Sequence, residues 1–195
     1  MEPKLRITIE PTAYLVAAMV LLCVPIPWVI SWVIAALVHE AGHGLAVWIF
    51  GYRLQHIHVG SGGVALQTGP MASWKAALCS MAGPAAGFLL MYVCRKFALL
   101  AVCAFVQSVY NLLPLCGLDG ERFLHSIVMI FGKNDLADRV CHMAGTLTML
   151  CVVCLCAYSV LILKLGILPL MVVGLLFLRK RNRKTPCKAG RIRVQ

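Results

Sequence analysis

The chain has 195 residues, of which 61% are hydrophobic and 13% are charged. Soluble domains carry about 25% charged residues, so this composition excludes an ordinary soluble domain and predicts a protein that crosses a membrane several times. The net charge is +11, but basic residues of membrane proteins gather in cytoplasmic loops and tails. We therefore expect no nucleic-acid partner.

Apolar runs predict about six transmembrane helices. Residues 13–50 are largely apolar, and one helix of that length would span about 57 Å, nearly twice the thickness of a bilayer core. The chain is therefore expected to turn at Pro25 and Pro27. The expected spans are residues 12–25, 28–50, 72–93, 97–113, 140–163 and 167–178.

The segment after the second expected span has a different pattern. Residues 55–60 alternate polar and apolar side chains, Ser61-Gly62-Gly63 is a turn signal, and residues 64–68 resume the alternation. This pattern predicts a short β-hairpin, re-entrant in the membrane, in an otherwise all-α polytopic membrane protein. A plain surface hairpin is the alternative interpretation.

The second expected span contains the sequence His39-Glu40-Ala41-Gly42-His43. Two histidines four residues apart share one face of a helix and can bind one metal ion, and the glutamate beside the first can act as general base. A charged side chain at the centre of a membrane helix costs about 2.5–3.5 kcal/mol, so Glu40 indicates function. The alternative is a chance occurrence of a short motif.

A zinc site of this kind needs a third protein ligand and an open position for water. Of the seven acidic residues, Glu40 and Asp119 alone have apolar surroundings, whereas Glu121 abuts Arg122 and the others lie in polar segments. Elimination favours Asp119. A helix-capping aspartate in a loop is the alternative.

The third expected span contains Gly83 and Gly87 in a G-x-x-x-G pattern. Small residues at this spacing let a second helix approach closely. Pro84 lies between them and predicts a kink or a break in this helix.

The two motifs resemble those of the site-2 protease family of intramembrane zinc metalloproteases. Its hallmark is H-E-x-x-H on one transmembrane helix and an N-x-x-P-x-x-x-L-D-G-type motif at the end of a later one, here His39–His43 and Asn111–Gly120. The Ala82-Gly83-Pro84 triplet also matches a family segment. The resemblance implies one zinc ion per chain, with these roles: metal ligands His39, His43 and Asp119, catalytic base Glu40, and substrate or oxyanion contact Asn111.

Three positions depart from the family pattern. Gly87 stands where the family often has Asn, and Gly117 and Glu121 replace residues that are commonly Pro and Gly. None of these changes removes a ligand. The chain is most similar to the minimal, sporulation-type bacterial branch of the family.

The resemblance implies hydrolysis of a peptide bond in a membrane-embedded or membrane-associated protein, such as a sigma-factor or anti-sigma-factor precursor. The expected partners are this substrate, the lipid bilayer and a regulatory membrane protein. A membrane metal-ion transporter and a catalytically inactive scaffold are the alternatives.

We expect one transmembrane metalloprotease domain over residues 1–178 and a basic tail over residues 179–195. The basic cluster at 179–184 indicates a cytoplasmic end. The protein is thus expected in the cell membrane with both termini in the cytoplasm. Residues 59–67 are expected to hold the substrate in an extended conformation.

Overall fold

The computed structural model describes residues 6–9, 14, 18, 20–60, 63–132 and 134–161. Most of the first expected span, the sixth expected span and the basic tail lie outside these residues. The elements are, in chain order, β1 (Arg6–Ile9), α2 (Ile26–Ile49), β2 (Leu54–Gly60), β3 (Gly63–Thr68), α3 (Ser73–Val93), α4 (Ala98–Leu112), α5 (Asp119–Ile130) and α6 (Asn134–Leu161).

Three helices, α2, α3 and α6, are long and apolar enough to cross a membrane, and α4 is a shorter apolar helix. The bounds of α2, α3 and α4 lie within two residues of the expected spans. Helix α6 begins at Asn134 rather than near residue 140, because its polar first turns continue the helix beyond the apolar run. The chain is thus a membrane protein, as its composition predicts.

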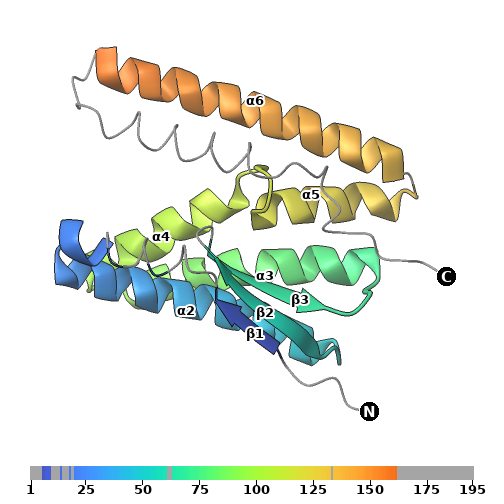
Figure 1. The fold of residues 1–195 in the computed structure, drawn as a ribbon, viewed down its shortest axis with the longest axis horizontal. Helices are drawn as coiled ribbons and strands as arrows, with labels where there is room; N and C mark the ends of the chain where they lie inside the picture. The colour runs from blue at the N-terminus through green and yellow to red at the C-terminus, as the bar shows by residue number, and fades with distance from the viewer. Residues whose placement is uncertain are drawn as a thin grey trace.

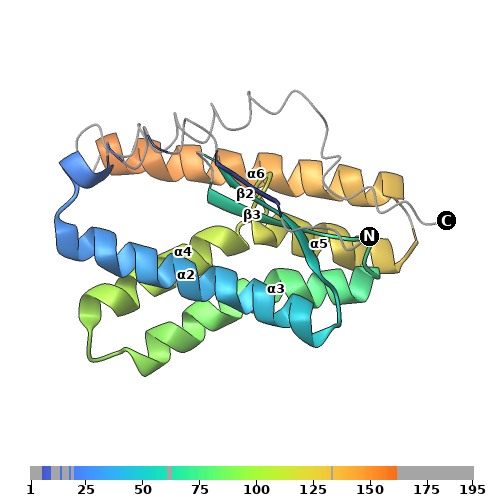
Figure 2. The ribbon, with the colours of Figure 1, turned by 60° about the horizontal axis from the view of Figure 1, so that its bottom comes forward.

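The helices lie side by side, with α3 in contact with α2, α4 and α5, and with α6 packed on α5 (Figures 1 and 2). Helices α2 and α4 run in the same direction, and α3 runs opposite to both. Their close packing uses small residues, because Ala35 of α2 is buried in one cluster with Cys103 and Ala104 of α4. Large apolar side chains such as Leu37 and Leu89 remain exposed, as expected for a surface that faces lipid.

A three-stranded sheet lies beside α2, which its strand β3 contacts (Figures 1 and 2). Its order is β1-β2-β3, with β2 parallel to β1 and antiparallel to β3. Strands β2 and β3 form a hairpin where the alternating pattern predicts one, so the protein is mainly helical but not entirely so. Strand β1 is not predicted by the sequence pattern, because it has four residues and pairs with residues about fifty positions away.

The G-x-x-x-G residues of α3 contact both neighbouring helices. A Cβ atom on Gly87 would meet Oγ of Ser108 on α4, and a Cβ atom on Gly83 would meet the imidazole of His43 on α2. These contacts confirm that the small residues permit close approach. Helix α3 is continuous through Pro84, so of the two predicted outcomes the break is wrong, and the kink stays a prediction. The proline ring is fully buried in the packed bundle.

Candidate metal centre

His39 and His43 occupy one face of α2, as their spacing predicts. His39 is buried, and its Nε2 atom lies 3.3 Å from Nε2 of His43. The two rings meet edge to face, with centroids 4.9 Å apart. The two ring nitrogens therefore converge on one point at the side of the helix.

Asp119 reaches the same point from α5. Its Oδ2 atom lies 2.9 Å from Nε2 of His39 and 3.1 Å from Nε2 of His43. Asp119 is the first residue of α5, and the N-cap position belongs to Leu118 without a side-chain capping bond. The alternative of a helix-capping aspartate is therefore wrong, because the carboxylate faces the two histidines.

The segment between α4 and α5 places Asp119 beside the two histidines of α2. Helix α4 ends at Leu112, and the chain turns through Gly117, whose φ of 87° favours glycine. Leu115 and Leu118 are buried in the turn. A Cβ atom on Gly120 would meet the carbonyl oxygen of Leu112, so the end of α4 and the start of α5 are in direct contact.

The three side chains fit a zinc ion. A tetrahedral site with metal–ligand bonds of about 2.0–2.2 Å places its ligand atoms roughly 3.3 Å apart. The three donor atoms lie 2.9, 3.1 and 3.3 Å from one another, slightly closer than that spacing. Two imidazoles and one carboxylate are a common donor set of catalytic zinc sites, and His39, His43 and Asp119 form the one such group among the described residues.

The orientation of His43 is fixed from its other side. Its Nδ1 atom lies 2.7 Å from the backbone carbonyl oxygen of Cys79. The carbonyl can accept only if Nδ1 carries the proton, which leaves the lone pair on Nε2 to face the ligand cluster. Gly83, one turn further along α3, leaves the space that the ring occupies. A backbone carbonyl has no sequence signature, so sequence patterns could not have revealed this partner.

Charged groups stabilise the ionised form of Asp119. Burial alone would raise the pKa of this carboxyl, but without a metal ion the imidazoles of His39 and His43, when protonated at Nε2, donate to the carboxylate, outweigh burial and hold the pKa well below its usual range. Nη1 of Arg122 lies 3.9 Å from the second carboxylate oxygen. A carboxylate at this position is therefore available as a metal ligand at neutral pH.

Two of the positions that depart from the family pattern contact each other. The backbone N–H of Gly117 donates to Oε2 of Glu121 over 2.6 Å. A proline at 117 would have no N–H to donate, and a glycine at 121 would have no side chain to accept. Glu121 thus closes the turn that leads into Asp119 and is not part of the metal-ligand group.

Glu40 lies beside this group, and Asn111 lies near the end of the helix that leads into Asp119. Glu40 is half-buried on α2 and interacts electrostatically with His39, His43 and Asp119. Asn111 is half-buried in the last turn of α4, beside the Leu112 carbonyl that contacts the start of α5. The structure therefore brings His39, His43, Asp119 and Glu40 together, and Asn111 lies one residue before the Leu112 carbonyl that contacts the start of α5.

A family model described as Peptidase M50B-like matches residues 12–118, which is more than half of the chain. The chain therefore belongs to the peptidase M50B-like family, and the site-2 protease resemblance is confirmed. The match includes the H-E-x-x-H motif and ends one residue before Asp119. The position of Asp119 in the site thus rests on the geometry described above.

Among solved structures, the site-2 protease from Methanocaldococcus jannaschii is similar, with a TM-score of 0.65 at 16% sequence identity. The likeness covers 92% of this chain and 90% of that protein. At this identity it shows a shared fold. No curated protein matches the sequence.

Proposed function

We propose that the protein is an intramembrane zinc metalloprotease that hydrolyses a peptide bond of a membrane-embedded or membrane-associated protein. The observation that carries this proposal is the convergence of His39, His43 and Asp119 within 3.3 Å of one another, beside Glu40. A protease of this family needs such a centre within helices that cross the membrane.

The chain's own residues supply the remaining chemistry. When bound, zinc would acidify a water molecule and polarise the substrate carbonyl. Glu40 would accept the proton of the attacking water and donate it to the leaving amine. Asn111 would donate from its side-chain amide to the carbonyl oxygen as negative charge develops there. Cys79 and Glu121 would keep His43 and Asp119 in place.

The substrate must be extended where it is cut, and the sheet offers an edge for this purpose. Strand β2 is paired on both sides, whereas β3 is paired with β2 alone among the described strands. We propose that an unwound substrate segment pairs with the free edge of β3, which satisfies backbone groups that are costly to leave bare at membrane depth. The substrate-holding segment would then be Gly63–Thr68, which overlaps the predicted residues 59–67.

Aromatic and basic residues gather at both ends of the bundle. Nζ of Lys75 lies 5.2–5.7 Å from the ring centroids of Phe50, Tyr52 and Trp74. The guanidinium of Arg95 lies 5.7 Å from the ring centroid of Tyr92. Lys75 and Arg95 are twenty residues apart, about 30 Å along a helix, which equals the thickness of a bilayer core. These residues suit the two membrane–water interfaces.

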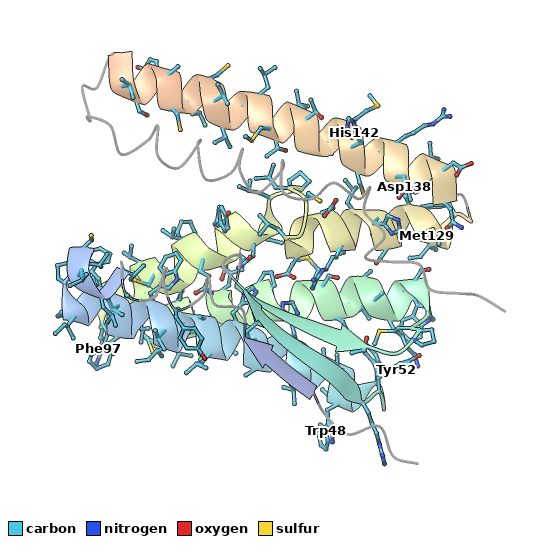
Figure 3. All side chains as sticks on the ribbon, viewed as in Figure 1. Trp48, Tyr52, Phe97, Met129, Asp138 and His142 are labelled. Carbon is cyan, nitrogen blue, oxygen red and sulfur yellow. The ribbon has the colours of Figure 1, made fainter. Side chains whose placement is uncertain are left out.

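The site is closer to one of these interfaces. Trp48 and Tyr52 lie at one end of the bundle and Phe97 at the other (Figure 3). His43 is six residues before the end of α2, about 9 Å from that end. Six spans with a basic tail would place both termini, and the Trp48 end, in the cytoplasm. The cut would then be made in the cytoplasmic half of the membrane.

The decisive experiment compares the wild type with Glu40→Gln. The purified full-length variant should keep one zinc per chain and lose cleavage of a single-span substrate, because Glu40 acts on water and is not a ligand. The sporulation-type resemblance makes a sigma-factor or anti-sigma-factor precursor the first substrate to assay. Loss of zinc from the variant would make Glu40 a ligand, and wild-type cleavage by the variant would refute the mechanism. Zinc transport without cleavage would support a transporter instead.

A further inference from the structure

The two histidines of the site differ in the surroundings of their second ring nitrogen. Nδ1 of His43 has the carbonyl oxygen of Cys79 as its partner. Nδ1 of His39 is buried and has no hydrogen-bond partner among the described residues. Across the same part of the chain, one other buried side-chain atom lacks a partner, and that atom is Oε1 of Gln107 on α4.

The two residues that carry these atoms lie one helical turn beyond a shared contact of two neighbouring helices. Helices α2 and α4 pack against each other and run in the same direction (Figure 1). Ala35 of α2 packs against Cys103 and Ala104 of α4. One helical turn further on, α2 presents His39, while α4 presents Gln107, which lies four residues after Cys103 and three after Ala104. The positions of His39 and Gln107 thus follow the Ala35 contact by one helical turn on each helix.

The chemistry of the two atoms is complementary. A neutral histidine that offers Nε2 to a metal carries its proton on Nδ1, so Nδ1 is a donor. Metal-binding histidines almost always donate this proton to a carboxylate, a carbonyl or a water molecule. The amide oxygen Oε1 of Gln107 is an acceptor. Gln107 is also a polar residue in an apolar helix, and such a residue indicates a function in a membrane protein.

We propose that Gln107 is the positioning residue for His39. In the metal-loaded protein, Nδ1–H of His39 donates to Oε1 of Gln107, either directly or through one bridging water molecule. Gln107 thereby does for His39 what the Cys79 carbonyl does for His43, and both imidazoles are held with Nε2 toward the cluster. The inference rests on the proposed zinc function.

The test measures zinc affinity of the purified full-length protein in detergent by competition with a chelator. Gln107→Leu should weaken zinc binding by about 10–100-fold, the range found when such partners are removed. Gln107→Glu retains an acceptor and should bind zinc at least as tightly as the wild type. Ser108→Ala is the matched control, because the Ser108 hydroxyl donates within α4 to Ala104, and its affinity should not change.

A second readout separates positioning from packing. The metal-free Gln107→Leu variant should unfold at the wild-type temperature, because leucine fills a similar volume without an unpaired oxygen. Its cobalt-loaded form should show a shifted visible absorption spectrum, since the geometry around the metal has changed. If Gln107→Leu binds zinc as the wild type does, or if Gln107→Glu weakens binding as leucine does, the inference is wrong. If Gln107→Leu does not fold, the zinc affinity of Gln107→Glu alone decides the inference. If the wild type binds no zinc, the proposed function is wrong.

Discussion

Gly83 allows the sharpest test of how the bundle shapes the metal site. In α3, a Cβ atom at this position would coincide with the space of the His43 imidazole, and the nearest ring atom is Nε2, the proposed ligand atom. Gly83→Ala adds a single methyl group and changes neither charge nor any ligand. The substitution therefore perturbs the position of His43 without removing it.

The size of the effect follows from the contact. Nε2 would have to retreat by about 1 Å before the contact became an ordinary one, whereas ligand distances of a metal site hold within about 0.2 Å. A displacement of about 1 Å near a reacting group can lower the rate about 100-fold, equivalent to about 2.7 kcal/mol. We expect Gly83→Ala to lose cleavage by at least this factor and to bind zinc correspondingly more weakly.

Zinc content, chelator competition and cleavage of the same substrate would measure the loss. Gly44→Ala is the matched control, because Gly44 lies on α2 beside His43 but a Cβ atom there meets nothing within 4 Å. This control should keep wild-type zinc affinity and gain about 0.5–1 kcal/mol of helix stability. If Gly83→Ala binds zinc and cleaves as well as Gly44→Ala does, the close contact with His43 does not govern the site.

Three further outcomes are expected. Glu121→Ala should weaken zinc binding several-fold, because the Gly117 N–H loses its acceptor. Glu121→Gln keeps an acceptor oxygen and should retain most of the zinc affinity. Equal zinc affinity of the two variants would show that the turn holds without this hydrogen bond. A proline scan over Val64, Ala65 and Leu66 of β3 should give at least one variant that binds zinc and folds but cleaves poorly, and normal cleavage by all three would place the substrate elsewhere. In otherwise cysteine-free protein, an impermeant thiol reagent added to intact cells should label Lys96→Cys but not Ala72→Cys, and the reverse pattern would invert the proposed orientation.

The spans that the sequence predicts well are those with a uniform apolar character. Helices α2, α3 and α4 begin and end close to the limits of their apolar runs, because the bilayer requires this match of length and hydropathy. The start of α6 is not predicted by hydropathy because four of the six residues over 134–139 are polar, and mean hydropathy does not detect a helix that extends beyond the apolar run. Strand β1 was missed because its partner is distant in sequence and a strand of four residues carries almost no pattern of its own.

The site was predicted where side-chain type carries the signal. The spacing of His39 and His43 and the apolar surroundings of Asp119 sufficed to predict that these three side chains converge, since a charge in a membrane is costly and therefore indicates a function. The groups that orient this cluster could not be found in the same way. The Cys79 carbonyl is a backbone atom, and the roles of Gly83 and Glu121 follow from which helix lies opposite, which only the packed structure reveals.

The length of α4 has a consequence for the lipid around the protein. Its 15 residues extend about 22 Å, roughly 8 Å less than the bilayer core. Val102, Phe105, Val106 and Val109 on this helix are exposed, so acyl chains beside it meet an apolar surface that is too short for them. Local thinning of the bilayer is one way in which such a mismatch is accommodated. A substrate helix that approaches along α4 would enter this thinned zone, where water reaches its backbone earlier than in the undisturbed membrane and unwinding needs less energy.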